Sequence, residues 1–89
     1  MNYMVNNKMN NKKKSIDVKI GSFIRQRRLA LGLNGKDLAR KLNLSQQQIS
    51  RYERGECVFS FYILILFFKA LDENIYEYMQ YFDFDNHIK

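Results

Sequence analysis

The sequence predicts a small all-α protein, and three observations lead to this fold class. The chain has 89 residues, of which 46% are hydrophobic, so it has material for one compact core and little more. It contains no Pro and only four Gly, so few positions would interrupt a helix. Apolar residues recur at helical spacing along much of the chain. We therefore expect one helical domain over residues 16–84 and a short tail over residues 85–89.

The first predicted helix starts at about Asp17 and ends before Gly32, a residue type that adopts positive φ at low cost. Its apolar face consists of Ile20, Phe23, Ile24 and Leu31. A short second helix is expected over residues 35–42. Asn34 would cap its start, and Asp37 stands where a capping box needs a second acceptor.

The third predicted helix runs from Gln46 to about Glu53 and is capped by Ser45. Asn43 precedes it, and Asn is one of the few residue types that tolerate left-handed geometry. The second and third helices are thus joined by a turn of about three residues, which lets them cross at a steep angle. The residues expected to pack at this crossing are Leu38, Ala39, Leu42, Leu44 and Ile49.

Two further helices complete the prediction. The fourth runs from Ser60 to Leu71; a buried strand over residues 59–68 is the alternative, but the segment is long for a strand and has no partner. The fifth begins near Asn74 and carries Ile75, Tyr76, Tyr78, Met79 and Phe82.

The net charge of +6 is unevenly distributed along the chain. Residues 1–14 carry +4, residues 15–55 carry +6 and residues 56–89 carry −4. The basic part suits a polyanion such as DNA, RNA or anionic lipid, and the acidic part should be repelled by it. Residues 1–15 are rich in Asn and Lys without an apolar period, so we expect a flexible basic arm, either a solvated tail or one that contacts DNA.

The predicted third helix presents a polar face with two useful chemistries. The residues on this face are Gln46, Gln47, Ser50, Arg51 and Arg54. Gln amides can bond adenine N6 and N7, and the Arg fork can bond guanine O6 and N7. An ordinary solvated helix surface is the alternative, because Gln and Arg are common helix formers.

A wider set of residues appears at characteristic spacings. It comprises Ile20-Gly21, Ile24-Arg25, Arg28, Asp37-Leu38-Ala39, Ser45, Ile49-Ser50, Tyr52-Glu53-Arg54-Gly55, Leu64 and Ala70-Leu71. This set resembles the Cro/C1-type (XRE) helix-turn-helix family of phage and bacterial repressors over residues 20–82. The resemblance implies a five-helix, lambda-repressor-like DNA-binding domain whose second and third helices form the helix-turn-helix. It also implies a cytoplasmic transcriptional regulator that binds double-stranded DNA as a homodimer.

The resemblance also assigns residue roles. Base reading falls to Gln46, Gln47 and Arg51, with Ser50 as an additional candidate. Phosphate contacts fall to Asn34, Gly35, Lys36 and Arg54. Gly35 departs from the family, which often has Gln there, so only its backbone amide remains as a donor. Arg28 and Glu53 are expected to form a partly buried structural ion pair.

Apolar residues beyond the needs of the core point to a dimer interface. The candidate interface residues are Tyr62, Ile65, Leu66, Tyr76, Tyr78 and Met79. The alternative is a core with an unusually aromatic C-terminal part.

Other functions are less well supported by the sequence. We expect no enzyme, since the single His87 stands near the end and no catalytic set can be proposed; no metal, cofactor or small-molecule ligand is expected either. No apolar run is long enough to span a membrane. The main alternative is an antitoxin of the same fold that binds a toxin. The string from Ser45 to Glu53 also resembles MrpJ-like regulators, which would imply control of fimbrial and motility genes.

Overall fold

The computed structural model describes the backbone of residues 3–81 and the side chains of residues 16–80. The described part contains five helices and no strand, which confirms the all-α prediction. The helices are α1 (Tyr3–Ala30), α2 (Gly35–Leu42), α3 (Gln46–Glu53), α4 (Phe61–Ala70) and α5 (Ile75–Tyr81). The predicted domain end at residue 84, the tail over residues 85–89 and Phe82 lie outside the described residues.

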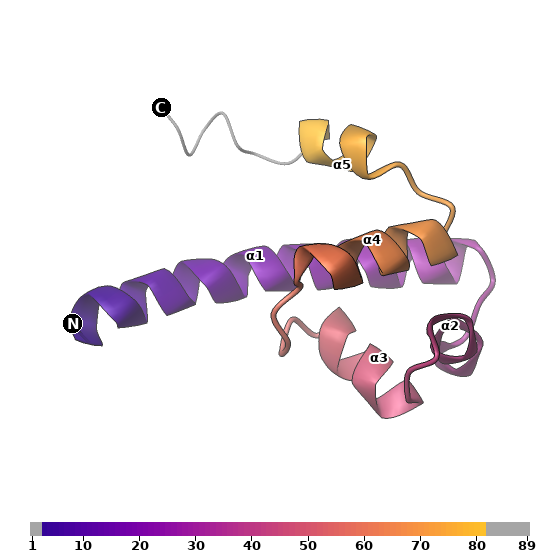
Figure 1. Ribbon diagram of the computed structural model, residues 1–89, viewed down its shortest axis with the longest axis horizontal. Coiled ribbons are helices and arrows are strands. Elements are labelled where there is room, and N and C mark those ends of the chain that lie inside the picture. The colour runs from indigo at the N-terminus through magenta and orange to yellow at the C-terminus, as the bar shows by residue number, and fades with distance from the viewer. Residues whose placement is uncertain (1–2, 82–89) are drawn as a thin grey trace.

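The helix α1 is longer than predicted at its N-terminal end. We expected a flexible arm over residues 1–15; in the structure α1 begins at Tyr3, and the flexibility of this segment stays a prediction. Nucleation is the costly step of helix formation, and the packed part of α1 supplies the nucleus; each further residue then adds a hydrogen bond at little cost. No Gly or Pro precedes Gly21 to stop this extension. The basic segment is therefore a helical extension that projects past the other helices (Figure 1).

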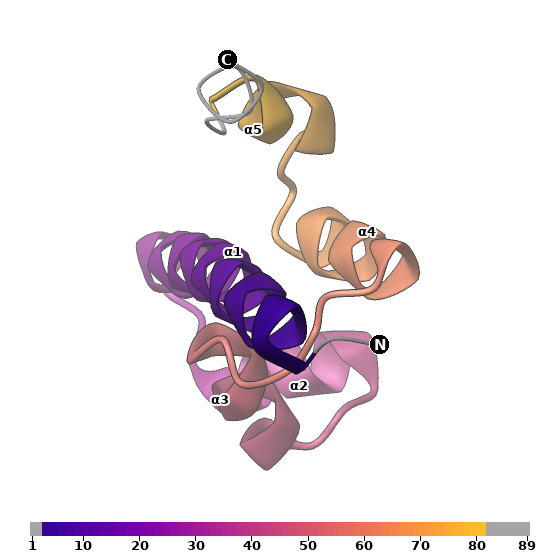
Figure 2. The same ribbon diagram turned by 90° about the vertical axis from the view of Figure 1, so that its left-hand side faces the viewer.

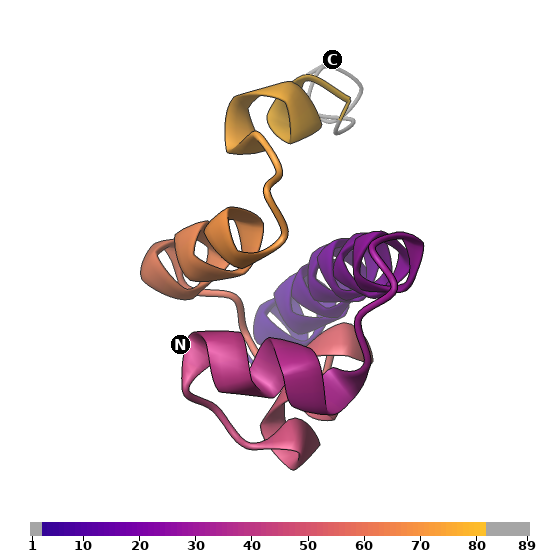
Figure 3. The ribbon, with the colours of Figure 1, turned by 90° about the vertical axis from the view of Figure 1, so that its right-hand side faces the viewer.

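The helices are arranged in three tiers. The helices α1 and α4 lie side by side, the pair α2 and α3 lies on one side of them, and α5 lies on the opposite side (Figures 1, 2 and 3). The helix-turn-helix unit therefore has a free outer surface that neither α4 nor α5 covers.

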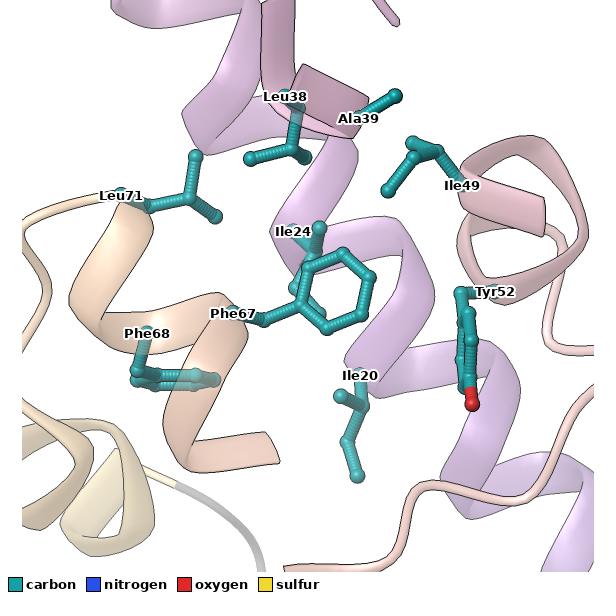
Figure 4. Packing of buried hydrophobic residues seen from close by; sticks show 9 residues of the cluster. All are labelled: Ile20, Ile24, Leu38, Ala39, Ile49, Tyr52, Phe67, Phe68 and Leu71. Atoms are coloured by element: carbon teal, nitrogen blue, oxygen red, sulfur yellow. The ribbon is translucent and has the colours of Figure 1, made fainter. Parts of the chain in front are cut away.

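The core is formed by residues of α1, α2, α3 and α4 and by Leu71, which follows α4 (Figure 4). It consists of Ile20, Ile24, Leu38, Ala39, Ile49, Tyr52, Phe67, Phe68 and Leu71. The predicted crossing residues Leu38, Ala39 and Ile49 are buried, and Leu42 and Leu44 pack against the cluster. Burial of this apolar surface is the main stabilising contribution to the fold.

One residue of the predicted apolar face of the first helix is not part of the core. Leu31 is 44% exposed, whereas Leu33 packs against the buried cluster. Gly32 has a φ of 74° and turns the chain directly after Leu31, so the residue after the turn, rather than the residue before it, reaches the core.

Within residues 3–81, no helix is both long enough and apolar enough to cross a membrane.

Candidate nucleic-acid interface

The ends of α2 hold the turn that leads into α3. At its start, Asn34 Oδ1 accepts the Asp37 N–H at 2.8 Å and Asp37 Oδ2 accepts the Asn34 N–H at 2.9 Å, which confirms the predicted capping box. At its end, Asn43 is left-handed with a φ of 57°, also as predicted. The next residue, Leu44, donates its N–H to the carbonyl of Ala39 at 2.9 Å. The capping box thus fixes the start of α2, and the turn at Asn43 and Leu44 defines the path of the chain into α3.

The start of α3 places two amide side chains at the surface. Ser45 caps the helix, because its Oγ accepts the N–H of Gln48 at 3.0 Å. Gln46 and Gln47 follow as the first helical residues, and both are exposed. One turn later Arg51 is exposed as well, with 57% of its side chain accessible to solvent. Two amides and one guanidinium thus share an accessible surface at the free side of the domain.

The opposite side of α3 is packed tightly against the domain. Ile49 is 1% exposed and Tyr52 is 9% exposed. Gly21 of α1 faces the end of α3, and a Cβ atom added there would stand 2.4 Å from the carbonyl oxygen of Tyr52 and 2.6 Å from that of Glu53. Only a residue without a side chain allows this approach of the two helices. The position of α3 is therefore set by backbone-to-backbone packing as well as by apolar burial.

Arg28 and Glu53 form a second connection between α1 and α3. Arg28 Nε donates to Glu53 Oε2 at 2.6 Å and Arg28 Nη2 donates to Oε1 at 3.0 Å, while Nη1 donates to the carbonyl of Leu33 at 2.9 Å. Only 11% and 6% of the two side chains are exposed. Hydrogen bonding to Glu53 raises the pKa of Arg28 above its usual value. The structure thus contains the ion pair that the family resemblance implied.

The C-terminal end of α3 carries a network of charged side chains. Arg54 Nε donates to Glu56 Oε2 at 2.7 Å, Nη2 donates to Oε1 at 3.2 Å, and Nη1 donates to the Oγ of Ser50. Arg51 Nε lies 3.9 Å from Glu56 Oε1. The hydrogen bonds from Arg54 hold the pKa of Glu56 below its usual value. Two cations expected at DNA and the hydroxyl of Ser50 are therefore already linked to one another in the free protein.

The start of α2 lies against the start of α3. A Cβ atom added to Gly35 would stand 3.3 Å from Gln46 Cγ and 3.4 Å from Gln46 Nε2, so the Gln46 side chain occupies the space beside this glycine. Lys36 is exposed next to it. Asn34 is exposed too, although its Oδ1 and its backbone N–H are engaged in the capping box. The candidate phosphate contacts at α2 are thus adjacent to the candidate base contacts at α3.

The six candidate dimer residues separate into three groups. Tyr62, Tyr76 and Met79 are 69%, 78% and 44% exposed, and Ile65 and Leu66 are half-buried. Tyr78 is different, because its ring packs on Phe23 at 4.2 Å and on Phe68 at 5.3 Å between ring centroids.

Tyr78 is therefore a partly buried residue that packs against the core of its own chain, and its assignment to the dimer interface stays a prediction. Burial raises its pKa. Residue 78 follows Ile75 at helical spacing, so the two share the inner face of α5, and both pack against the buried cluster. Tyr76 and Met79 remain exposed.

The structure shows contacts of three further residues that the sequence analysis did not predict. Gly21 sits at the helix crossing, Glu56 holds two arginines, and the carboxylate of Asp17 is buried and accepts the N–H of Phe59 at 3.4 Å. Gly21 carried a signal, because a glycine in the middle of an apolar helical pattern often marks close packing. Glu56 and Asp17 had no signal, since their partners depend on how the chain folds back.

Comparison with known proteins agrees with this architecture. Residues 24–78, more than half of the chain, match the model of the family HTH_3, described as helix-turn-helix. The matched segment includes α2 and α3 together with the core residues of α4. It begins at Ile24, in the C-terminal part of α1, so the basic extension lies outside the match.

Curated relatives are transcriptional regulators by name. An uncharacterised helix-turn-helix-type regulator of Rickettsia prowazekii is 40% identical over 68 residues, which is 72% of this chain and 52% of the relative. An uncharacterised transcriptional regulator in the ATPase CF(0) region of Rhodospirillum rubrum is 50% identical over 40 residues, 45% of this chain and 37% of the relative. The chain thus spans only about a third to a half of the relatives it matches. The match over residues 24–78 shows that the protein belongs to the helix-turn-helix family.

Proposed function

We propose that this protein is a transcriptional regulator that binds double-stranded DNA sequence-specifically, with α3 in the major groove. One observation carries the proposal: α3 exposes Gln46, Gln47 and Arg51 on its outer face while Ile49 and Tyr52 anchor its inner face in the core. A rigidly held helix with base-reading side chains on its outer face is the recognition element of helix-turn-helix proteins. Such a regulator acts at the chromosome, in the cytoplasm. The names of the curated relatives agree with this role.

The exposed side chains of α3 match the donors and acceptors of base edges. Gln46 and Gln47 each carry an amide that can bond adenine N6 and N7 together, and Arg51 carries a fork that fits guanine O6 and N7. Ser50 lies on the same face and is half-buried, with its Oγ already accepting a hydrogen bond from Arg54. We therefore assign base reading to the two glutamines and Arg51, and a secondary role to Ser50.

Phosphate contacts come from both ends of the helix-turn-helix. At the start of α2, the backbone N–H of Gly35 and the ammonium of Lys36 are the donors, and the side-chain amide of Asn34 lies next to them. Helix N-termini favour phosphate because their N–H groups point outward. At the end of α3, Arg54 has 54% of its side chain exposed to solvent. These contacts set the register of α3 in the groove without reading sequence.

A selection of bound duplexes from a random pool, followed by affinity measurements with Arg51→Ala and Arg54→Ala, tests the proposal. Arg51→Ala should weaken the selected site by roughly 1–3 kcal/mol and relax the preference at one base pair. Arg54→Ala should weaken all duplexes alike. The exposed Lys69 of α4 provides the control, since Lys69→Ala removes the same charge outside the helix-turn-helix. Equal, weak binding to every duplex at low salt would contradict the proposal.

The protein binds its site as a homodimer that uses exposed apolar residues of α4 and α5. Tyr62, Tyr76 and Met79 are the exposed members of this surface, and Ile65 and Leu66 contribute their accessible parts. Because α5 lies on the side of the domain away from α2 and α3, such a contact leaves the recognition helix free (Figure 3). Two recognition helices must then stand about 34 Å apart, one turn of DNA. Light scattering at micromolar concentration should give twice the monomer mass, and a strict monomer would contradict this arrangement.

The regulated genes are fimbrial and motility genes. This part of the proposal is supported only by the resemblance of the string from Ser45 to Glu53 to MrpJ-like regulators. Genome-wide mapping of bound sites tests it. Sites concentrated at other operons would contradict the assignment of targets and leave DNA binding intact.

A further inference from the structure

The carboxylate of Glu56 lies against two of the cations that the proposed function places at DNA. It accepts two hydrogen bonds from Arg54, at 2.7 Å from Nε and 3.2 Å from Nη2. The same group stands 3.9 Å from the Nε of Arg51. All three side chains are about half exposed, so this pairing occurs at the surface where a duplex would dock.

The contact between Glu56 and Arg54 uses the edge of the guanidinium that phosphate also uses. Two parallel N–H donors meet two oxygens of one anion, which is the two-point geometry of Arg with carboxylate and with phosphate. A phosphate can make the same contact only by displacing Glu56. If the carboxylate instead stays in place, it repels the phosphate from close range. Either way, the negative charge of Glu56 opposes DNA binding.

The backbone holds Glu56 in this place. Gly55 has a φ of 75° and turns the chain back over the end of α3, and the N–H of Glu56 then donates to the carbonyl of Arg51 at 2.9 Å. A Cβ atom added to Gly55 would stand 2.6 Å from the Cα of Val18 in α1, so this turn is itself packed against the domain. The turn at Gly55 therefore holds the carboxylate of Glu56 next to the arginines.

We infer that Glu56 competes with DNA phosphate for Arg54 at the end of the recognition helix and thereby limits the affinity of the protein for every duplex. Binding to unrelated DNA depends almost entirely on phosphate contacts, whereas binding to the correct site also gains from base contacts. Arg54 meets a phosphate in both kinds of complex, so a built-in competitor for Arg54 weakens both by about the same factor. Glu56 therefore lowers total affinity and leaves the ratio between the two nearly unchanged. The inference rests on the proposed function.

The test is Glu56→Gln, which keeps the shape of the side chain and removes its charge. Affinity is measured for the selected site and for an unrelated duplex at 50 mM and 200 mM salt. From the range for exposed ion pairs, we expect the unrelated duplex to bind about two- to fivefold tighter at low salt. The selected site should gain by about the same factor, and both gains should shrink at high salt because charges are then screened.

Two further variants separate this inference from simpler explanations. Glu77→Gln makes the same change of net charge at an exposed position on α5 and should leave both affinities nearly unchanged. In an Arg54→Ala background, Glu56→Gln should lose most of its effect, because the main group it competes for is gone. Circular dichroism spectra and melting curves of each variant verify that it is folded.

The outcomes are distinguishable. Weaker binding by Glu56→Gln would show that Glu56 positions the arginines for DNA, and would overturn the inference. If Glu77→Gln raises DNA affinity as much as Glu56→Gln does, or if Glu56→Gln keeps its full effect in the Arg54→Ala background, the effect comes from net charge alone. Either result would also overturn the inference. A wild-type protein that binds the unrelated duplex as well as any selected one would refute the proposed function itself.

Discussion

Replacement of Glu53 by Ala should strongly destabilise the protein, and the reason is the arginine that it leaves behind. Arg28 is 9% exposed as a residue, and two of its hydrogen bonds go to Glu53. Removal of one partner from a buried ion pair costs about 3–5 kcal/mol, because the remaining charge has no compensation. We expect about 3 kcal/mol, the low end of this range, because Arg28 keeps its bond to the Leu33 carbonyl and a little access to water.

That loss is large compared with the stability of a small domain, which is on the order of 5 kcal/mol. For a domain of this size, 1 kcal/mol shifts the melting temperature by about 4–8 °C, so Glu53→Ala should melt roughly 12–24 °C lower than wild type. The assay is thermal denaturation followed by circular dichroism. Glu77→Ala, at an exposed site on α5, is the matched control and should melt within a few degrees of wild type.

A double variant tests the cause of the destabilisation. Arg28→Met combined with Glu53→Leu removes both charges and keeps most of the volume, so it should be much less destabilised than Glu53→Ala. If Glu53→Ala melts like wild type, the ion pair does not stabilise the fold. If it melts like wild type and also loses DNA binding, Glu53 acts at the DNA and its structural role is refuted.

Two further changes probe the surface that faces DNA. Deletion of residues 2–14 should flatten the dependence of DNA affinity on salt, by about 0.9 in the log–log slope for each phosphate contact that the basic extension makes; an unchanged slope would mean that the extension does not touch DNA. Gly35→Ala should leave the melting temperature equal or higher, because Ala favours a helix more than Gly does. It should change the preferred base opposite Gln46, since the added Cβ would lie 3.3–3.4 Å from atoms of the Gln46 side chain and force it to move. A selection experiment that returns the wild-type site would show that Gly35 has no influence on base reading.

The helix-turn-helix was predictable because its signals are local. A capping box needs two side chains three residues apart, and a left-handed residue after a short helix needs only an Asn or a Gly. Asn34, Asp37 and Asn43 fulfil these conditions within their own neighbourhood, so the start and end of α2 agree with the prediction. The polar face of α3 follows from helical periodicity once its cap at Ser45 is known.

The features that differed from prediction depend on distant parts of the chain. Tyr78 packs on Phe23 and Phe68 because α5 returns over them, and the composition of α5 does not predict that return. The N-terminal extension is similar. Its residues have little tendency to form a helix alone, and the packed part of α1 provides the nucleus from which the helix continues.

The two sides of the C-terminal end of α3 divide the requirements of recognition between them. At the buried side, Gly21 and the pair of Arg28 with Glu53 hold the helix through contacts that tolerate almost no change. At the exposed side, Arg54 and Glu56 form a pair of half-exposed charges, which costs little to break when a phosphate arrives. A reading helix must keep its orientation for base contacts to be selective, but its cations must be free to exchange one anion for another. The buried pair of Arg28 and Glu53 on the inner side of α3 satisfies the first condition, and the half-exposed pair of Arg54 and Glu56 on its outer side satisfies the second.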